Sequence, residues 1–190
     1  MVTFDTHRLT LRMLRETDFE AYAEMCADQN VMRYIGDGQP MARPLAWRKL
    51  ALMIGHWALR GYGLWAAEER SSGLFVGYIG FWNPEGWPGF ELGWTLRQSF
   101  WGRGFATEGA QAALQFAFTE LHQSQVISLI HPENAASIRV AQRLGERWVD
   151  STEVMGQPVS VYRITRGEWE GGKPTQEARR DFRDQRQATP

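Results

Sequence analysis

The residues best suited to chemistry lie in one glycine-rich stretch, Gly102-Arg103-Gly104-Phe105-Ala106-Thr107. It follows an apolar segment typical of a strand and leads into ATEGAQAALQFAFTEL, whose apolar residues recur at helical spacing. Glycines let the main chain turn tightly, and the first N–H groups of a helix are unpaired at the positive end of its dipole. The stretch therefore predicts a phosphate or pyrophosphate site, to which Arg103 could add a charged hydrogen bond.

Two familiar phosphate motifs do not fit this turn. A Rossmann turn needs a third glycine, but Thr107 occupies that position. A P-loop needs Gly-Lys followed by Ser or Thr, which is absent. Taken alone, the turn is equally well interpreted as a plain connection between a strand and a helix.

The elements around the turn follow from the hydrophobic period. Strands are predicted at 8–14, 64–70, 74–82, 90–97, 125–130, 147–151 and 159–165. Helices are predicted at 19–27, 45–59, 106–121 and 134–144, with loops at 30–40 and 83–89. Antiparallel strands first and helical crossovers later indicate an α/β chain.

Composition bounds the class of protein. The 190 residues suit one domain with a substantial core, which we place at residues 1–166, before a polar, charge-rich tail at 167–190. The net charge of -1 offers no basic surplus for a nucleic-acid partner. The N-terminus does not resemble a signal peptide and no apolar run approaches ~18 residues, so we expect a cytoplasmic protein without a membrane span. The single cysteine, Cys26, allows neither an internal disulfide nor a cysteine-based zinc site, and we expect no metal.

Two ordered motifs resemble a known superfamily. Glu91–Leu96 followed by Phe100–Glu108 resembles the central motif of the GCN5-related N-acetyltransferases, most closely the RimJ/RimL-like branch of ribosomal-protein N-terminal acetyltransferases. Asn134–Gly145 resembles the family's asparagine-containing helix that ends in Leu-Gly, and Arg8–Arg12 fits the same branch. The resemblance covers roughly residues 6 to 166. One departure is Trp101, which stands where the family usually has Gln or Arg.

The resemblance implies a fold and a cofactor. The fold is α/β (α+β), with a mixed, mostly antiparallel sheet of about seven strands flanked by about four helices, splayed between the fourth and fifth strands. The cofactor is acetyl-CoA, whose pantetheine arm would pair with the free edge of the fourth strand at Trp94, Thr95 and Leu96. The pyrophosphate would lie on the turn, held by Gly102, Arg103, Gly104, Phe105, Ala106 and Thr107.

The resemblance also suggests residues for the transfer chemistry. Asn134 matches a residue that contacts the cofactor, although Asn is equally favoured as a helix N-cap. Ser137 is a candidate proton donor to the departing thiolate, or else a solvated or helix-bonded serine. Glu91 is a candidate general base for the amine, or else a strand residue paired with an arginine. Glu85 and His131 are weaker candidates for the base.

The acceptor site is expected between residues 32–57 and the aromatic loop at 82–90. Trp82, Trp87 and Phe90 could stack on an aromatic or cationic acceptor, or could cover the core. The implied reaction moves an acetyl group to a primary amine, on a small molecule or a protein N-terminus, by direct attack in a ternary complex. The competing hypothesis is a non-catalytic acyl-CoA-binding module of the same fold, and a homodimer is left open.

Cys26 lies at an apolar position of the first predicted helix. Core packing is therefore the better interpretation of this thiol than an acyl-cysteine role.

Overall fold

The computed structural model describes residues 2–172 of the chain. The strands are β1 Phe4–Asp5, β2 Leu9–Met13, β3 Leu64–Glu69, β4 Phe75–Trp82, β5 Glu91–Leu96, β6 Gln125–Ile130, β7 Arg147–Val154 and β8 Gln157–Thr165. The helices are α1 Phe19–Ala27, α2 Gln29–Met32, α3 Arg43–Arg60, α4 Phe105–Thr119, α5 Ala135–Arg143 and α6 Arg166–Gly171. Short 3-10 turns at Glu16–Asp18 and Gln98–Phe100 precede α1 and the glycine-rich turn.

One open sheet organises the described chain, with strand order β1-β2-β3-β4-β5-β6-β8-β7. Every neighbouring pair is antiparallel except β5 and β6, which are parallel. Glu91 and Ile127 form the single paired position between these two strands in the described residues. The predicted mixed, mostly antiparallel sheet is confirmed, and so is its parting between the strands at 90–97 and 125–130.

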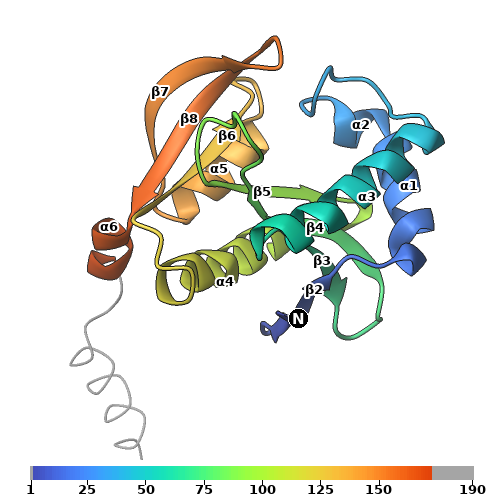
Figure 1. The fold of residues 1–190 in the computed structure, drawn as a ribbon, viewed down its shortest axis with the longest axis horizontal. Helices are drawn as coiled ribbons and strands as arrows, with labels where there is room; N and C mark the ends of the chain where they lie inside the picture. Colours follow the sequence, from blue (N-terminus) through green and yellow to red (C-terminus); the bar gives the residue numbers. More distant parts are fainter. Residues whose placement is uncertain (1, 173–190) are drawn as a thin grey trace, which may run out of the picture.

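Helices cover both faces of the N-terminal half of the sheet (Figure 1). On one face α1 and α3 bury a cluster that includes Tyr22, Met53 and Phe75. On the other face α4 packs on a larger core around Trp65 and Phe105. Trp65 is fully buried, and its indole donates to the Val2 carbonyl at 3.2 Å. Between these two layers β5 pairs with β4 along its whole length on one side, while its other side is only partly paired.

Local sequence explains the ends of the principal helices. Pro44 lies in the first turn of α3, and Gly61 ends that helix with φ 75°. Asn134 caps α5 by accepting a hydrogen bond from the Ser137 N–H at 3.1 Å. Gly145, with φ 88°, follows α5 in the conformation expected of a helix C-terminal glycine.

The structure differs from the sequence prediction in its shortest elements. Residues 2–172 contain eight strands rather than about seven, because the additional strand, Phe4–Asp5, pairs with β2 over only two residues. The predicted loop at 30–40 overlaps the four-residue helix α2. The predicted tail at 167–190 begins inside α6, which is capped by Thr165 and whose Trp169 ring lies 5.1 Å from that of Phe118. The rest of that tail, 173–190, lies outside the described residues.

A helix long and apolar enough to cross a bilayer is not found between residues 2 and 172.

Candidate active site

The site is organised by the strand gap, the opening between β5 and β6 past the pair of Glu91 and Ile127. The Ile127 N–H donates to the Phe90 carbonyl at 3.0 Å, but the Leu92 carbonyl accepts instead from the Ser128 hydroxyl at 2.8 Å. Main-chain groups of alternate strand residues face the same neighbour, so those of Trp94 also point toward β6. Since β6 has already diverged there, the Trp94 N–H and C=O face an open side.

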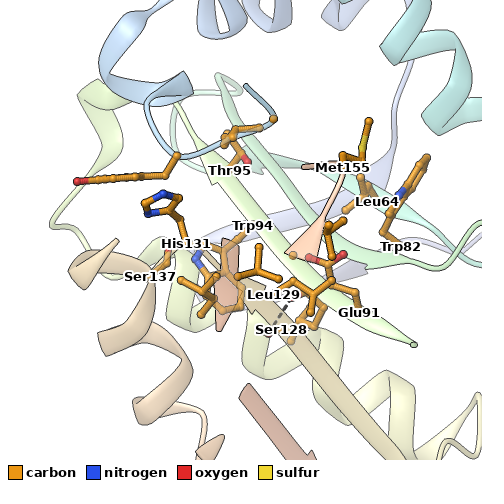
Figure 2. Close-up of a pocket in the computed structure, with 18 of the residues that line it drawn as sticks. Leu64, Trp82, Glu91, Trp94, Thr95, Ser128, Leu129, His131, Ser137 and Met155 are labelled. Carbon is orange, nitrogen blue, oxygen red and sulfur yellow. Dashed lines mark hydrogen bonds between the residues drawn. The ribbon is translucent and has the colours of Figure 1, made fainter. Parts of the chain in front are cut away.

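A cavity of about 510 Å³ lies along this gap. Figure 2 shows side chains from both halves of the molecule converging on it, with Glu91 near the centre and Ser137 and His131 on one side. The α2–α3 loop contributes Tyr34 and Gly36, and the tip of the β7–β8 hairpin contributes Met155. Among the predicted residues, those that line the cavity are Trp82, Trp87, Glu91, Trp94, Thr95, His131, Asn134 and Ser137.

Glu91 is the carboxyl group best placed for proton transfer. Burial raises the pKa of Glu91 to about 7, although hydrogen bonds from the Trp87 side chain and the Leu129 main chain favour its charged form. The Trp87 Nε1–H donates to Glu91 Oε2 at 2.7 Å. The alternative prediction for Glu91, pairing with an arginine, is wrong for the described residues, because its side-chain partner there is an indole. A group with this pKa accepts and releases protons near neutral pH.

Asn134 and Ser137 lie one helical turn apart on the wall of the cavity. The side chain of Asn134 accepts from the Ser137 N–H, so its capping role is confirmed. The Ser137 hydroxyl makes no hydrogen bond to another described residue. It is therefore available to a ligand in the cavity.

The glycine-rich turn has the geometry predicted for an anion site. Gly102 and Gly104 have φ of 73° and 82°, which glycine adopts without steric cost. Gly104 is the N-cap of α4, no side chain caps this end, and the first intrahelical bond runs from the Glu108 N–H to the Gly104 carbonyl. The N–H groups of Phe105, Ala106 and Thr107 thus remain available, and these residues fit the diphosphate of coenzyme A.

The structure corrects the role predicted for the Arg103 side chain. Its guanidinium pairs with Glu69 and lies 4.7 Å from the centre of the Phe105 ring. This charge is thus directed to β3 rather than free for a phosphate. A residue that the motif did not suggest, Arg8, braces the turn: it donates to the Arg103 carbonyl at 2.8 Å and pairs with Glu108 at 2.7 Å.

Trp101, the departure from the family pattern, has a defined contact. Its indole N–H donates to the Leu96 carbonyl at 2.8 Å. By the same alternation, that carbonyl lies on the open side of β5. Trp101 therefore occupies the Leu96 carbonyl, which was predicted to pair with the pantetheine arm. Trp94 is the residue of β5 whose main-chain groups face the gap without such a partner.

The three aromatic residues predicted for the acceptor site separate into two groups. Trp82 and Trp87 line the cavity, and the Trp82 ring stacks on His56 at 4.6 Å. Phe90 is only 9% exposed and packs 4.6 Å from Phe81 and 4.9 Å from Tyr62, measured between ring centres. For Phe90 the acceptor prediction is wrong and core packing holds, because its side chain points to the sheet face that α4 covers.

The remaining candidates are also placed. Cys26 is 3% exposed in the core beside Tyr22, and it does not belong to the cavity wall within the described chain. Glu85 is fully exposed and pairs with Arg60 at 3.5 Å, away from that wall. His131 lies on the wall, with its ring 5.1 Å from Tyr34, and its Nδ1 accepts from the Glu133 N–H at 3.2 Å.

Several residues of the site were missed by sequence analysis. Ser128 carried a local signal, since it is a hydroxyl inside the apolar strand QVISLI. Glu146 is the neighbour of Ser128 and follows the Leu-Gly end of α5. No feature of the sequence signalled its burial, because a charged residue after a helix usually faces solvent. Met155 reaches the cavity through tertiary packing alone, whereas Tyr34 and Lys49 lie within residues 32–57, the segment expected to build the acceptor site.

No three His, Cys, Asp or Glu side chains are grouped to hold a metal ion within residues 2–172.

The mixed sheet parts between β5 and β6, and a glycine-rich turn leads into α4. Together these two features define the class as an acetyltransferase fold. A family model described as Acetyltransferase (GNAT) domain matches residues 8–147, and the chain belongs to this family. The uncharacterised protein YkkB of Bacillus subtilis is 30% identical over 165 residues, 83% of this chain and 92% of its own. A crystal structure of an acetyltransferase from Agrobacterium tumefaciens is 31% identical with a TM-score of 0.78, covering 87% of this chain and 95% of that one.

The RimJ/RimL-like branch has weaker support. A structure described as the ribosomal L7/L12 alpha-N-protein acetyltransferase RimL in complex with coenzyme A has a TM-score of 0.70 but 15% identity, covering 86% of this chain and 98% of its own. At that identity the likeness shows the fold alone. Membership of the acetyltransferase family is thus established at the level of the superfamily, whose members use acetyl-CoA.

Proposed function

We propose that this chain is an acetyl-CoA-dependent N-acetyltransferase that acylates a primary amine by direct attack in a ternary complex. The observation that carries the proposal is the placement of Glu91, with a pKa of about 7, on the same cavity as the open main chain of Trp94. A proton acceptor and a hydrogen-bond donor therefore face one volume, which the strand gap leaves accessible.

The donor site uses main-chain groups. When bound, acetyl-CoA supplies an activated acyl group. The N–H groups of Phe105, Ala106 and Thr107 would hold the diphosphate at the start of α4. The Trp94 N–H is placed to donate a hydrogen bond to the acyl oxygen, and such a donor is most effective where negative charge develops.

The acceptor must lose a proton before or during attack. An alkyl ammonium has a pKa of about 10 and a chain N-terminus about 8, so a base is needed near neutral pH. Glu91 takes that proton on its carboxylate. As the C–N bond forms and the C–S bond breaks, the Ser137 hydroxyl can give a proton to the departing sulfur and regain one from the amine nitrogen, which loses its second proton on becoming an amide. Cys26 is buried away from the cavity wall, which supports direct attack over an acyl-cysteine route.

The cavity wall favours a small acceptor with an apolar or aromatic body. The apolar and aromatic side chains on this wall include Tyr22, Tyr34, Met53, Trp82 and Trp87. A volume of about 510 Å³ falls in the range of small-molecule sites. Lys49 is the single Lys or Arg on the wall within the described residues, so amines that also carry a carboxylate belong among the candidates.

The test measures thiol release from acetyl-CoA against a panel of aromatic monoamines, amino acids, polyamines and peptides with free N-termini. We expect release with at least one apolar amine, retained in Cys26→Ser and strongly reduced in Glu91→Gln. Tight coenzyme A binding by calorimetry without release for any acceptor would instead identify a non-catalytic binding module.

A further inference from the structure

The most unusual group outside the mechanism above is the carboxyl of Glu146. It is 2% exposed and follows Gly145 at the end of α5. Its Oε1 lies 3.0 Å from Ser128 Oγ, and Ser128 Oγ lies 2.8 Å from the Leu92 carbonyl oxygen. Its Oε2 has no hydrogen-bond partner in the described structure. A buried carboxyl oxygen without a partner requires an explanation.

Counting protons in this chain of contacts supplies one. The Ser128 hydroxyl has one proton and the Leu92 carbonyl can only accept, so Ser128 must donate to Leu92 if both contacts are hydrogen bonds. The contact between Ser128 and Glu146 then needs its proton from Glu146. Only a protonated carboxyl group can provide it.

The surroundings favour the protonated form. Burial raises the pKa of Glu146 to about 8, the Ser128 hydrogen bond opposes this, and the charge of Glu91 adds to it. Glu91 on β5 is the charged group that acts on Glu146 among the described residues, and within them no Lys, Arg or His lies within 4.0 Å of it. An isolated buried carboxylate is costly, so the group stays neutral.

The position of this chain matters for the proposed reaction. Leu92 and Ser128 are the first residues past the paired position of Glu91 and Ile127. A continued parallel ladder would satisfy the Leu92 carbonyl with a β6 main-chain N–H, closing the strands further. The Ser128 side chain supplies that hydrogen bond instead. The next residue of β5 with main-chain groups on this side is Trp94.

We propose that Glu146 is a positioning residue, held as a neutral acid, that donates to Ser128 and thereby keeps the strand gap open for the acyl donor. This inference rests on the proposed function, since it assigns the gap to acetyl-CoA. A neutral Glu146 also leaves Glu91 as the single negative charge of the pair. Ionisation of Glu146 would turn the Ser128 proton toward the new carboxylate, release the Leu92 carbonyl and oppose the charge of Glu91.

The protonation state can be read without any ligand. In a Glu91→Gln background, infrared spectroscopy of the apo protein at pH 7 should show one protonated carboxyl band that disappears in Glu91→Gln/Glu146→Gln. This band should titrate well above the ordinary pKa of 4.5, because burial is the main cause of the shift, but below the wild-type value of about 8, because the charge of Glu91 is absent. Absence of the band would overturn the proposal. This result does not depend on whether the protein transfers acetyl groups.

The positioning role is tested by coenzyme A calorimetry from pH 6.5 to 9.5, with Ser151→Ala on exposed β7 as the control. Glu146→Gln keeps a neutral donor, so we expect its Kd within about threefold of wild type at pH 7 and without the wild-type weakening above pH 8. Ser128→Ala should bind about tenfold more weakly throughout.

Two results would contradict the positioning role: identical pH curves for wild type and Glu146→Gln, or unchanged binding by Ser128→Ala. Urea unfolding of each variant shows whether it is folded. If coenzyme A binds to none of the proteins, the proposed function fails, while the infrared result still decides the state of Glu146.

Discussion

At the scale of single residues, Glu91 combines burial with one strong donor, the Trp87 indole. Removing its carboxylate in Glu91→Gln should lower kcat by about 10²-fold or more, which is typical of a lost general base. In wild type the rate should rise with pH as Glu91 loses its proton around pH 7, and this acid limb should be absent from the variant. Initial rates of thiol release between pH 5.5 and 9 measure both effects.

Glu85→Gln is the matched control, because Glu85 is fully exposed and outside the cavity wall. It should leave the rate and its pH dependence unchanged. Equal loss in both variants, or an acid limb that persists in Glu91→Gln, would show that another group accepts the proton.

A second residue-scale prediction concerns the indole donor. Trp87→Phe keeps an aromatic wall but removes the N–H that favours the charged form of Glu91. The pKa of Glu91 should rise further, moving the acid limb upward by about one pH unit. Trp82 lies opposite Glu91 on the neighbouring strand β4 but makes no hydrogen bond to it, so Trp82→Phe should change acceptor KM but leave the limb in place. An unmoved limb in Trp87→Phe would argue against this hydrogen bond in solution.

The family resemblance predicted that Glu91, Asn134 and Ser137 belong to one site, and all three line the same cavity. It could not rank Glu91 above Glu85 by environment, because exposure depends on how the loop between β4 and β5 folds. The same limit applies to Phe90, whose side chain faces the core although Trp87 and Glu91 line the cavity.

At the scale of elements, α4 must approach the sheet closely for its N-terminus to lie beside β5. Gly109 permits this: a Cβ there would lie 2.4 Å from Ile79 Cδ1. Gly109→Ala should therefore lower the free energy of unfolding by about 1–3 kcal/mol and weaken coenzyme A binding through displacement of the turn. Urea unfolding and calorimetry measure the two effects.

Gly55 in α3 provides the matched comparison, since a Cβ there would meet nothing within 4 Å. Gly55→Ala should stabilise the protein by up to about 1 kcal/mol through helix propensity. Similar changes at both positions would mean that propensity rather than packing governs α4.

The elements predicted from sequence were those with a clear hydrophobic period. β6 and α1 were both predicted at the bounds observed. β1, α2 and α6 escaped prediction because two, four and six residues are too few to show a period. Their positions depend on packing, as the Thr165 cap and the contact of Trp169 with Phe118 show for α6.

At the scale of the whole molecule, the cavity exists because two distant parts of the chain face each other across the strand gap. The α2–α3 loop lies on one side and the β7–β8 hairpin on the other (Figure 1). No local pattern links Tyr34 to Met155, so their meeting follows only once the sheet order is known. The parted sheet was predictable from the resemblance, whereas the pairing of Glu91 with the buried carboxyl group of Glu146 beside it was not.

That pair should set the pH dependence of stability. Glu91 and Glu146 have folded-state pKa values of about 7 and about 8, against an ordinary value of 4.5. Below pH 4.5 both groups are protonated in either state. As pH rises toward 8, the unfolded chain releases protons that the folded chain retains, so stability falls and then levels off. Glu69 and Glu108 have lowered pKa values, mainly from hydrogen bonds that outweigh burial, and cost stability only when pH falls through their acidic range.

We therefore expect maximal stability near pH 5–6 and a loss of about 4–7 kcal/mol by pH 8.5, measured as the free energy of unfolding in urea. Glu91→Gln/Glu146→Gln removes both titrations, so its stability should be nearly level over this interval. Glu85→Gln/Glu153→Gln removes two exposed carboxylates and should retain the wild-type slope. Each double variant lacks two carboxylates, so their unfolded chains are nearly identical. A difference between the two variants in the slope of stability against pH therefore comes from Glu91 and Glu146 in the folded protein. Parallel slopes in wild type and the buried double variant would mean that both carboxyl groups ionise in the folded protein as they do in water.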